Sequence, residues 1–247
     1  MRRSKRKNGC AGGVLSVLVI ALVAIVFVLG NSFTGNKENK PQSNTSIPSS
    51  TLTPNLAETE TSNTAKTENV LILVNKDNKL PDDYKVNLTT IESVKVASIL
   101  IDDLNEMRNA AEKDNYYILI NTGYRTVAEQ ERIFNDTVSN YVNQGNSRNI
   151  AEERARQATA PPGYSEHHTG LAIDFTMNGT YDQRLEMWDW LSKNANKYGF
   201  ILRYPENKEH ITGYTFEPWH YRYVGKEHAK SIYDNGLLFE EYLLSLE

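Results

Sequence analysis

Two short segments contain the residue types best suited to chemistry. Residues 165–175 read SEHHTGLAIDF, which places an imidazole and a carboxylate seven residues apart with a glycine between them. Further along the chain, residues 217–220 read EPWH and supply a second imidazole and a second carboxylate. Two histidines, one aspartate and a spare glutamate match a catalytic zinc site with one open coordination position. We therefore expect a metal site formed by these two segments.

Strand periodicity leaves two candidates for the first histidine ligand. In a strand over residues 171–175, Asp174 points away from the face that carries the large apolar side chains. A strand that continued back without a break would place His168 on the face of Asp174. A turn at Gly170 would instead bring His167 over Asp174, because glycine adopts turn conformations readily. The alternation of side chains along a strand does not by itself decide between His167 and His168, and the glycine favours His167.

The second segment needs a bend to bring its two polar groups together. Glu217 and His220 are three residues apart, and on a regular strand such positions point to opposite faces. Pro218 lies between them, and its fixed φ favours a bend. A lone His–Asp pair is more often a structural hydrogen bond than a metal site. The combination of two His, Asp174 and Glu217 makes the metal site the better interpretation.

The surrounding pattern predicts an α+β domain over residues 70–247. Capping-box patterns at 89–92, 126–129 and 180–183 predict three helix starts, and the first of these helices should end near Lys113. Further helices are predicted over 150–159, 227–234 and 239–245, and strands over 116–121, 171–175, 200–203 and 219–224. The irregular order of these elements favours a central antiparallel sheet with flanking helices over a parallel α/β fold.

One basic side chain lies where it could serve the site. Arg125 follows a predicted strand and a tight corner at residues 122–124, just before a predicted helix. Side chains at such strand ends often project into clefts. Gln130 lies in the first turns of the same helix. The alternative for Arg125 is an ordinary solvated surface residue.

The N-terminal part of the chain predicts export. Residues 1–10 carry five basic residues and no acid, and residues 11–30 contain no charge. Twenty apolar residues match a hydrocarbon core of roughly 30 Å. An uncleaved single-pass anchor is favoured over a cleaved signal peptide, because no clear small-residue cleavage site follows. The basic tail keeps the N-terminus cytoplasmic, so the rest of the chain lies outside. Residues 31–69 are rich in Ser, Thr, Asn and Pro and predict a disordered extracellular linker.

The exported part is acidic and has no cysteine. Without the five basic residues of the tail, 22 Lys and Arg remain against 31 Asp and Glu, a net charge of −9. Such a charge argues against nucleic acid as a partner. The single cysteine, Cys10, precedes the apolar segment, so the domain must be stabilised by its own core, to which a bound metal would add.

The two chemical segments resemble the two-part signature of VanY-type D-alanyl-D-alanine carboxypeptidases, which belong with lysostaphin-like enzymes and the hedgehog domain. In this chain the signature reads Ser165-x-His167-x-x-Gly170-x-Ala172-x-Asp174, followed by Glu217-x-x-His220. Further family-like blocks are Gly123-Tyr124-Arg125 with Gln130, residues 162–167, 198–200 with 203–205, and 217–225. The resemblance covers most of residues 70–247. Small departures include His168, where glutamine is expected.

The resemblance implies a role for each matching residue. Its pattern implies His167, Asp174 and His220 as ligands of one Zn²⁺ ion, in a hedgehog/D-Ala-D-Ala-peptidase-like fold. It implies Glu217 as the general base, which passes a proton from the attacking water to the leaving amine. Arg125 matches the arginine that stabilises the oxyanion or holds the substrate carboxylate. The remaining substrate-binding candidates are Gln130 and Ser165.

The resemblance also implies a function. We expect a membrane-tethered, monomeric zinc carboxypeptidase on the extracellular face of a Gram-positive cell, which removes the C-terminal D-alanine from peptidoglycan stem peptides. An L,D-carboxypeptidase acting on tetrapeptide stems is the close alternative, since the family contains both. A peptidoglycan endopeptidase and a non-catalytic wall-binding module are further alternatives. The presence of Glu217 favours an enzyme over the binding module.

Overall fold

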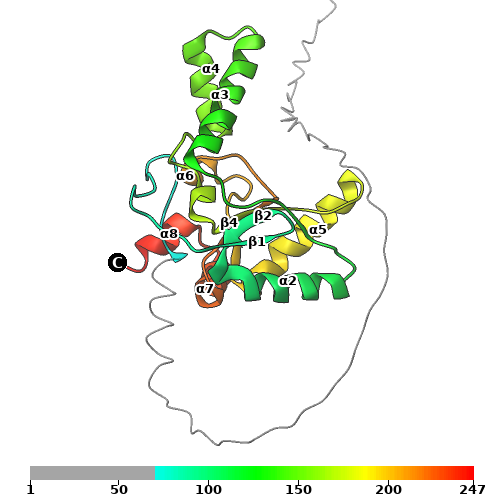
Figure 1. Ribbon diagram of the computed structural model, residues 1–247. Helices are drawn as coiled ribbons and strands as arrows, with labels where there is room; N and C mark the ends of the chain where they lie inside the picture. Colours follow the sequence, from blue (N-terminus) through cyan, green and yellow to red (C-terminus); the bar gives the residue numbers. More distant parts are fainter. Residues whose placement is uncertain (1–69) are drawn as a thin grey trace, which may run out of the picture. The chain divides into compact units, whose positions relative to one another are not determined.

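A four-stranded antiparallel sheet lies at the centre of the domain. The computed structural model describes residues 70–247 (Figure 1). The strand order is β3-β4-β6-β5, and every neighbouring pair is antiparallel. The strands are β3 (Leu119–Thr122), β4 (Ala172–Thr176), β5 (Phe200–Leu202) and β6 (His220–Tyr223). The predicted α+β architecture with a central antiparallel sheet is therefore confirmed.

The main core lies between this sheet and two helices, α2 (Ile101–Lys113) and α5 (Tyr181–Asn194). Ile173 and Phe175 of β4 point into this core, so Asp174 between them points away from it. The helices contribute an apolar stripe each: Leu104, Met107 and Ala111 from α2, and Met187, Trp188 and Leu191 from α5. One face of the sheet is thus used for stability and leaves the polar side chains of the other face free for chemistry.

The predicted helix start at residues 89–92 is wrong. These residues belong to a β-hairpin formed by β1 (Leu88–Ile91) and β2 (Val94–Ala97). Its turn residues Glu92 and Ser93 both have positive φ, 51° and 73°, as a tight hairpin turn with the right twist requires. The carboxylate of Glu92 pairs with Arg108 instead of capping a helix. The β-branched residues around the turn outweigh the apparent capping box, and the same apolar spacing suits either structure.

The other two capping boxes are confirmed. Thr126 and Glu129 exchange hydrogen bonds at the start of α3 (Val127–Asn143), and Thr180 does so with Gln183 at the start of α5. Together with α4 (Arg148–Ala158), α3 forms a helical hairpin that projects away from the sheet (Figure 1). Its small core consists of Val138, Ala151 and Ala155.

The C-terminal elements form a second apolar cluster. After η3 (Ala195–Tyr198) and α6 (Glu209–Thr212), helices α7 (Lys226–Asn235) and α8 (Phe239–Leu244) pack beside β5. This cluster contains Ile201, Val224, Ala229, Ile232, Phe239 and Tyr242. The cluster connects α8 to β5, the edge strand of the sheet.

The predicted N-terminal segments lie outside the described residues. This applies to the basic tail at 1–10, the membrane anchor at 11–30 and the linker at 31–69. Among the helices of residues 70–247, none is both long and apolar enough to traverse a bilayer.

The corner after β3 has no room for a side chain at Gly123. A Cβ atom there would lie 2.3 Å from the carbonyl oxygen of Lys95 and 2.8 Å from Cγ1 of Val96. The next residue, Tyr124, donates its backbone N–H to the same carbonyl at 2.6 Å. The close approach of this corner to the hairpin therefore depends on glycine.

We expect Gly123→Ala to destabilise the protein by about 2 kcal/mol, because the added methyl group overpacks the contact with the hairpin backbone. Urea unfolding followed by circular dichroism measures the change. Gly145→Ala is the control: nothing lies within 4 Å of its Cβ position, and only its φ of +91° opposes the substitution. Its cost should be about 1 kcal/mol or less. Equal losses in the two variants would contradict this view of the corner.

Candidate metal centre

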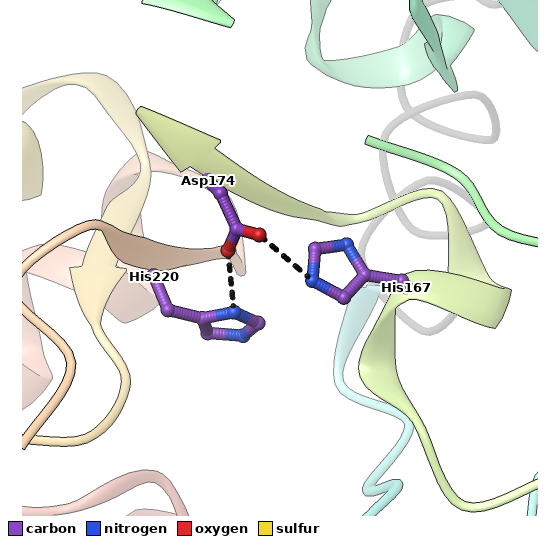
Figure 2. A group of neighbouring side chains, drawn as sticks. All are labelled: His167, Asp174 and His220. Carbon is purple, nitrogen blue, oxygen red and sulfur yellow. Dashed lines mark hydrogen bonds and ion pairs between the residues drawn. The ribbon is translucent and has the colours of Figure 1, made fainter. Parts of the chain in front are cut away.

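His167, Asp174 and His220 converge on one point beside the sheet (Figure 2). Nε2 of His167 lies 3.5 Å from Oδ2 of Asp174, and Nδ1 of His220 lies 3.0 Å from Oδ1 of the same carboxylate. One ligand atom from each residue fits within a group in which all separations are below 4.8 Å, and all three residues are buried. Among residues 70–247, this is the group of His, Cys, Asp and Glu side chains that could hold a metal ion.

Strand pairing and a glycine turn create this convergence. Asp174 on β4 is directly opposite His220 on β6 in the antiparallel register, so their side chains project from neighbouring positions. His167 lies on the short 3₁₀ helix η2 (Glu166–Thr169), which Gly170 ends in the left-handed conformation with φ 71°. The turn returns His167 over Asp174, as the glycine led us to expect.

His168 lies outside this group and has a different use. Its Nε2 accepts a hydrogen bond from the backbone N–H of Gly163 at 3.1 Å, and its Nδ1 lies 2.8 Å from the carbonyl oxygen of Arg125. Since Nε2 accepts, Nδ1 carries the proton and donates to that carbonyl. Both nitrogens of this buried histidine are therefore occupied in joining two loops.

Each of the two histidines of the group has one ring nitrogen directed at Asp174, where a metal could bind. Nδ1 of His167 lies 2.7 Å from the carbonyl oxygen of Gly123, which can only accept, so Nδ1 carries the proton and Nε2 presents a lone pair. Nε2 of His220 lies 3.3 Å from the Glu166 carboxylate, and its Nδ1 faces Asp174. Two nitrogens and a carboxylate fit the ligand preferences of Zn²⁺ in a three-ligand catalytic site.

The charge states of the three residues differ. His167 is neutral at pH 7, because burial and the nearby Arg125 cation lower its pKa to about 4. Burial also opposes charge on His220, but hydrogen bonds to Asp174 and Glu166 raise its pKa to about 9. Burial acts to raise the pKa of Asp174, yet the two histidines hold it well below its usual range. A metal ion that binds here must displace the proton of His220, so its affinity falls in acid.

Glu217 lies beside the group as a spare carboxylate. A turn at Pro218 is present, and the backbone N–H of His220 donates to the carbonyl oxygen of Glu217 at 3.1 Å. This bend places Oε2 of Glu217 3.9 Å from Nδ1 of His220. Burial raises the pKa of Glu217 to about 7. The carboxyl group is thus close enough to act on a reactant at the metal position, and it retains partial access to solvent.

Arg125 supplies the positive charge of the site. One guanidinium nitrogen lies 3.4 Å from Oδ2 of Asp174, and another donates to Oε1 of Gln130 at 3.2 Å. Gln130 is itself buried and held by the carbonyl oxygen of Ala160 at 2.7 Å. The hydroxyl of Ser165 caps η2 by accepting from the backbone N–H of His167. The structure therefore gives Ser165 and Gln130 supporting contacts, and their substrate-binding roles stay predictions.

Sequence reasoning missed two residues that contact the second histidine. Tyr204 stacks on the imidazole of His220, with ring centroids 4.8 Å apart and an interplanar angle of 28°. Glu166 lies behind the same imidazole, in ion pairs with the buried Arg203 and Arg222. One signal was available in the sequence: Arg222 is two residues after His220 in a strand, so both side chains share a face. A charged residue there indicates a buried polar network behind the ligand.

Comparison with known proteins agrees with this geometry. The family described as VanY, D-alanyl-D-alanine carboxypeptidase, matches residues 93–226. The chain belongs to the VanY family. A curated D-alanyl-D-alanine carboxypeptidase from Enterococcus faecalis is 41% identical over 174 residues, a match that covers 70% of this chain and 65% of that relative. The chain thus matches just under two thirds of the length of this relative.

Two solved structures share the fold. A mutant of the vancomycin resistance D,D-pentapeptidase VanY in complex with Zn(II) is 40% identical, with a TM-score of 0.68, and the match covers 71% of this chain and 99% of that one. The LD-carboxypeptidase LdcB is 39% identical, with a TM-score of 0.60, covering 72% and 86% of the two chains. The VanY family fold therefore occurs in proteins described as D,D and as L,D peptidases.

We expect Asp174→Asn to weaken zinc binding by more than about 100-fold, since loss of a supporting hydrogen bond to a ligand already costs 10–100-fold. The amide keeps the size of the side chain and removes the charge that compensates the metal. Competition with a chromophoric chelator measures the affinity. His168→Gln is the matched control, and its affinity should stay close to that of the wild type. A similar loss in both variants would contradict the ligand assignment.

Proposed function

We propose that this protein is a zinc-dependent D-alanyl-D-alanine carboxypeptidase that removes the C-terminal D-alanine from peptidoglycan stem peptides. The observation that carries this proposal is the buried group of His167, Asp174 and His220 with the spare carboxylate of Glu217 beside it. Membership of the VanY family and the Zn(II) complex of a 40% identical D,D-pentapeptidase support it. A structural metal site needs no spare carboxylate at its edge, whereas hydrolysis does.

The three ligand residues would hold one Zn²⁺ ion. When bound, zinc supplies Lewis-acid chemistry by lowering the pKa of a water and polarising the scissile carbonyl. Glu217 takes the proton of the attacking water and delivers it to the amine of the leaving D-alanine, so one carboxylate serves both halves of the reaction. Its location beside the ligand group, rather than within it, leaves it free for this proton transfer.

Arg125 would hold the terminal carboxylate of the substrate or the developing oxyanion. A guanidinium group is always protonated and binds a carboxylate through two parallel hydrogen bonds. Gln130 accepts a hydrogen bond from the Arg125 side chain, and Ser165 is the N-cap residue of η2. Binding of a free terminal carboxylate by Arg125 would favour an exopeptidase over an endopeptidase.

L,D-carboxypeptidase activity on tetrapeptide stems is the second candidate, favoured by the similarity to LdcB. The two activities differ in the residue that precedes the terminal D-alanine and in the stem length, so they place different demands on the pocket. A wall-binding module is the candidate from another class. It would bind the peptide without releasing an amino acid.

With full zinc occupancy, we expect the purified full chain to release D-alanine from a defined pentapeptide stem, and to lose that activity with chelator. Glu217→Gln should bind zinc like the wild type and lose about 10²–10⁴-fold in kcat, because the general base is absent. Chromatography of released D-alanine measures the rate, and a tetrapeptide stem is the parallel substrate.

The outcomes separate the candidates. Release from the tetrapeptide alone would assign the L,D activity. Cleavage inside the stem would assign an endopeptidase. Zinc-loaded protein that binds stem peptide and releases nothing would be a wall-binding module and would contradict the carboxypeptidase proposal.

We further propose that the protein is a monomer anchored by residues 11–30 in the membrane of a Gram-positive cell, with its N-terminus cytoplasmic. The uncharged apolar segment after a basic tail supports this proposal. In fractionated cells the protein should remain with the membranes through a high-salt wash, and added protease should digest residues 70–247 on intact protoplasts. Recovery in the medium would indicate a cleaved signal peptide instead.

A further inference from the structure

Glu166 is a fully buried carboxylate that the proposed reaction does not use. It begins η2 and immediately precedes the ligand His167, yet its side chain turns toward the other histidine, His220. Its side chain has no exposed surface. A buried carboxylate is costly unless each oxygen has a partner, so the partners of its two oxygens show what the residue does.

One oxygen is held by two arginines. Oε1 of Glu166 lies 2.8 Å from Nε of Arg203 and 3.2 Å from a guanidinium nitrogen of Arg222. Arg203 is also anchored by the carboxylate of Glu240 on α8, at 2.9 and 2.5 Å. Arg222 donates to the carbonyl oxygens of Val70 and Ile72, at 3.0 and 2.8 Å. Because these contacts come from four separate segments, the carboxylate cannot rotate freely.

The other oxygen faces the imidazole of His220. Oε2 of Glu166 lies 3.3 Å from Nε2 of His220, on the opposite side of the ring from Nδ1 and Asp174. An ionised carboxylate only accepts hydrogen bonds, so Nε2 must carry a proton to bond with it. Tyr204 stacks on the same ring and fixes its plane. The ring is thus defined in both plane and direction.

We propose that Glu166 is a positioning residue that keeps the proton of His220 on Nε2 and thereby presents the Nδ1 lone pair to the metal. This inference rests on the proposed zinc site and identifies what orients one of its ligands. Partners of this kind commonly fix the tautomer and ring orientation of metal-binding histidines. Here the two arginines supply the rigidity, since they hold Oε1 and leave Oε2 for the imidazole.

A single turn of η2 then orients both histidine ligands. His167 is itself oriented by the carbonyl oxygen of Gly123, which receives its Nδ1–H. Its neighbour Glu166 orients His220, which lies 54 positions later in the chain. The ring centroids of the two histidines are 5.0 Å apart, and the two ring planes are nearly perpendicular, at 88°. All four residues of η2 are buried, so both contacts are shielded from solvent.

Replacement by glutamine should reverse the tautomer. An amide has one oxygen, and Arg203 and Arg222 can only donate, so that oxygen must face the arginines. The NH₂ group is then directed at Nε2 of His220, which has to accept the hydrogen bond. The proton moves to Nδ1, where it blocks the metal position. Zinc affinity should therefore fall by about 10–100-fold.

The test measures zinc affinity and stability separately in the full-length protein. Glu166→Gln is compared with Glu240→Gln, which removes a partner of the same Arg203 and does not contact His220. Competition with a chromophoric chelator gives the affinity for zinc alone, and thermal unfolding in chelator gives the stability of the metal-free protein. We expect both variants to lose stability and only Glu166→Gln to lose zinc affinity. Equal zinc affinities in the wild type and Glu166→Gln would overturn the proposal, as would equal losses in both variants.

A second measurement needs no variant. Long-range ¹H–¹⁵N spectra of the zinc-loaded wild type identify the protonated nitrogen of each histidine. We expect His220 to carry its proton on Nε2, and a proton on Nδ1 would overturn the assignment even if Glu166→Gln does not fold. Failure of the wild type to bind zinc at all would instead refute the proposed function, so the two failures are distinguishable.

Discussion

The antiparallel pairing of β4 with β6 is the constraint on which the rest of the structure depends. It sets Asp174 opposite His220 and, in the same register, Ala172 opposite Arg222. Because side chains alternate across a strand, a shift of one residue would exchange the polar and apolar faces of β4. The apolar face, which packs on α2 and α5, therefore fixes the register and with it the separation of the two ligands. The core stabilises the fold, and the register that it fixes sets the geometry of the site.

The polar face depends on buried ion pairs. Arg203 and Arg222 are fully buried, and each would be unfavourable without Glu166 and its other partners. Such a network adds little net stability when complete and costs several kcal/mol when broken. Its value lies in specificity, because it links the first described segment, the sheet, η2 and α8 behind a single imidazole. Arg203 and Arg222 thus hold Glu166 in place behind His220.

Much of this molecule was predictable from the sequence. The spacing of His167, Gly170 and Asp174, together with Glu217 and His220, predicted the metal group, and the structure brings those ligand candidates together. The capping boxes at Thr126 and Thr180 formed as expected, since each depends on side chains only three residues apart. The start of α2 was mispredicted, because a hairpin turn with two positive φ angles has no distinct signature at Glu92 and Ser93.

What the sequence determined by itself was local: the residue types for zinc chemistry, the glycine turn and the helix starts. The sequence favoured His167 over His168 through Gly170, and tertiary structure decided what His168 does instead, which is to join two loops. Tertiary structure alone placed Glu166 behind His220, since that contact spans 54 positions and requires two strands and a turn to meet. Hydrogen bonds that select a tautomer form only when donor and acceptor lie about 3 Å apart, and the packing of the core sets those distances.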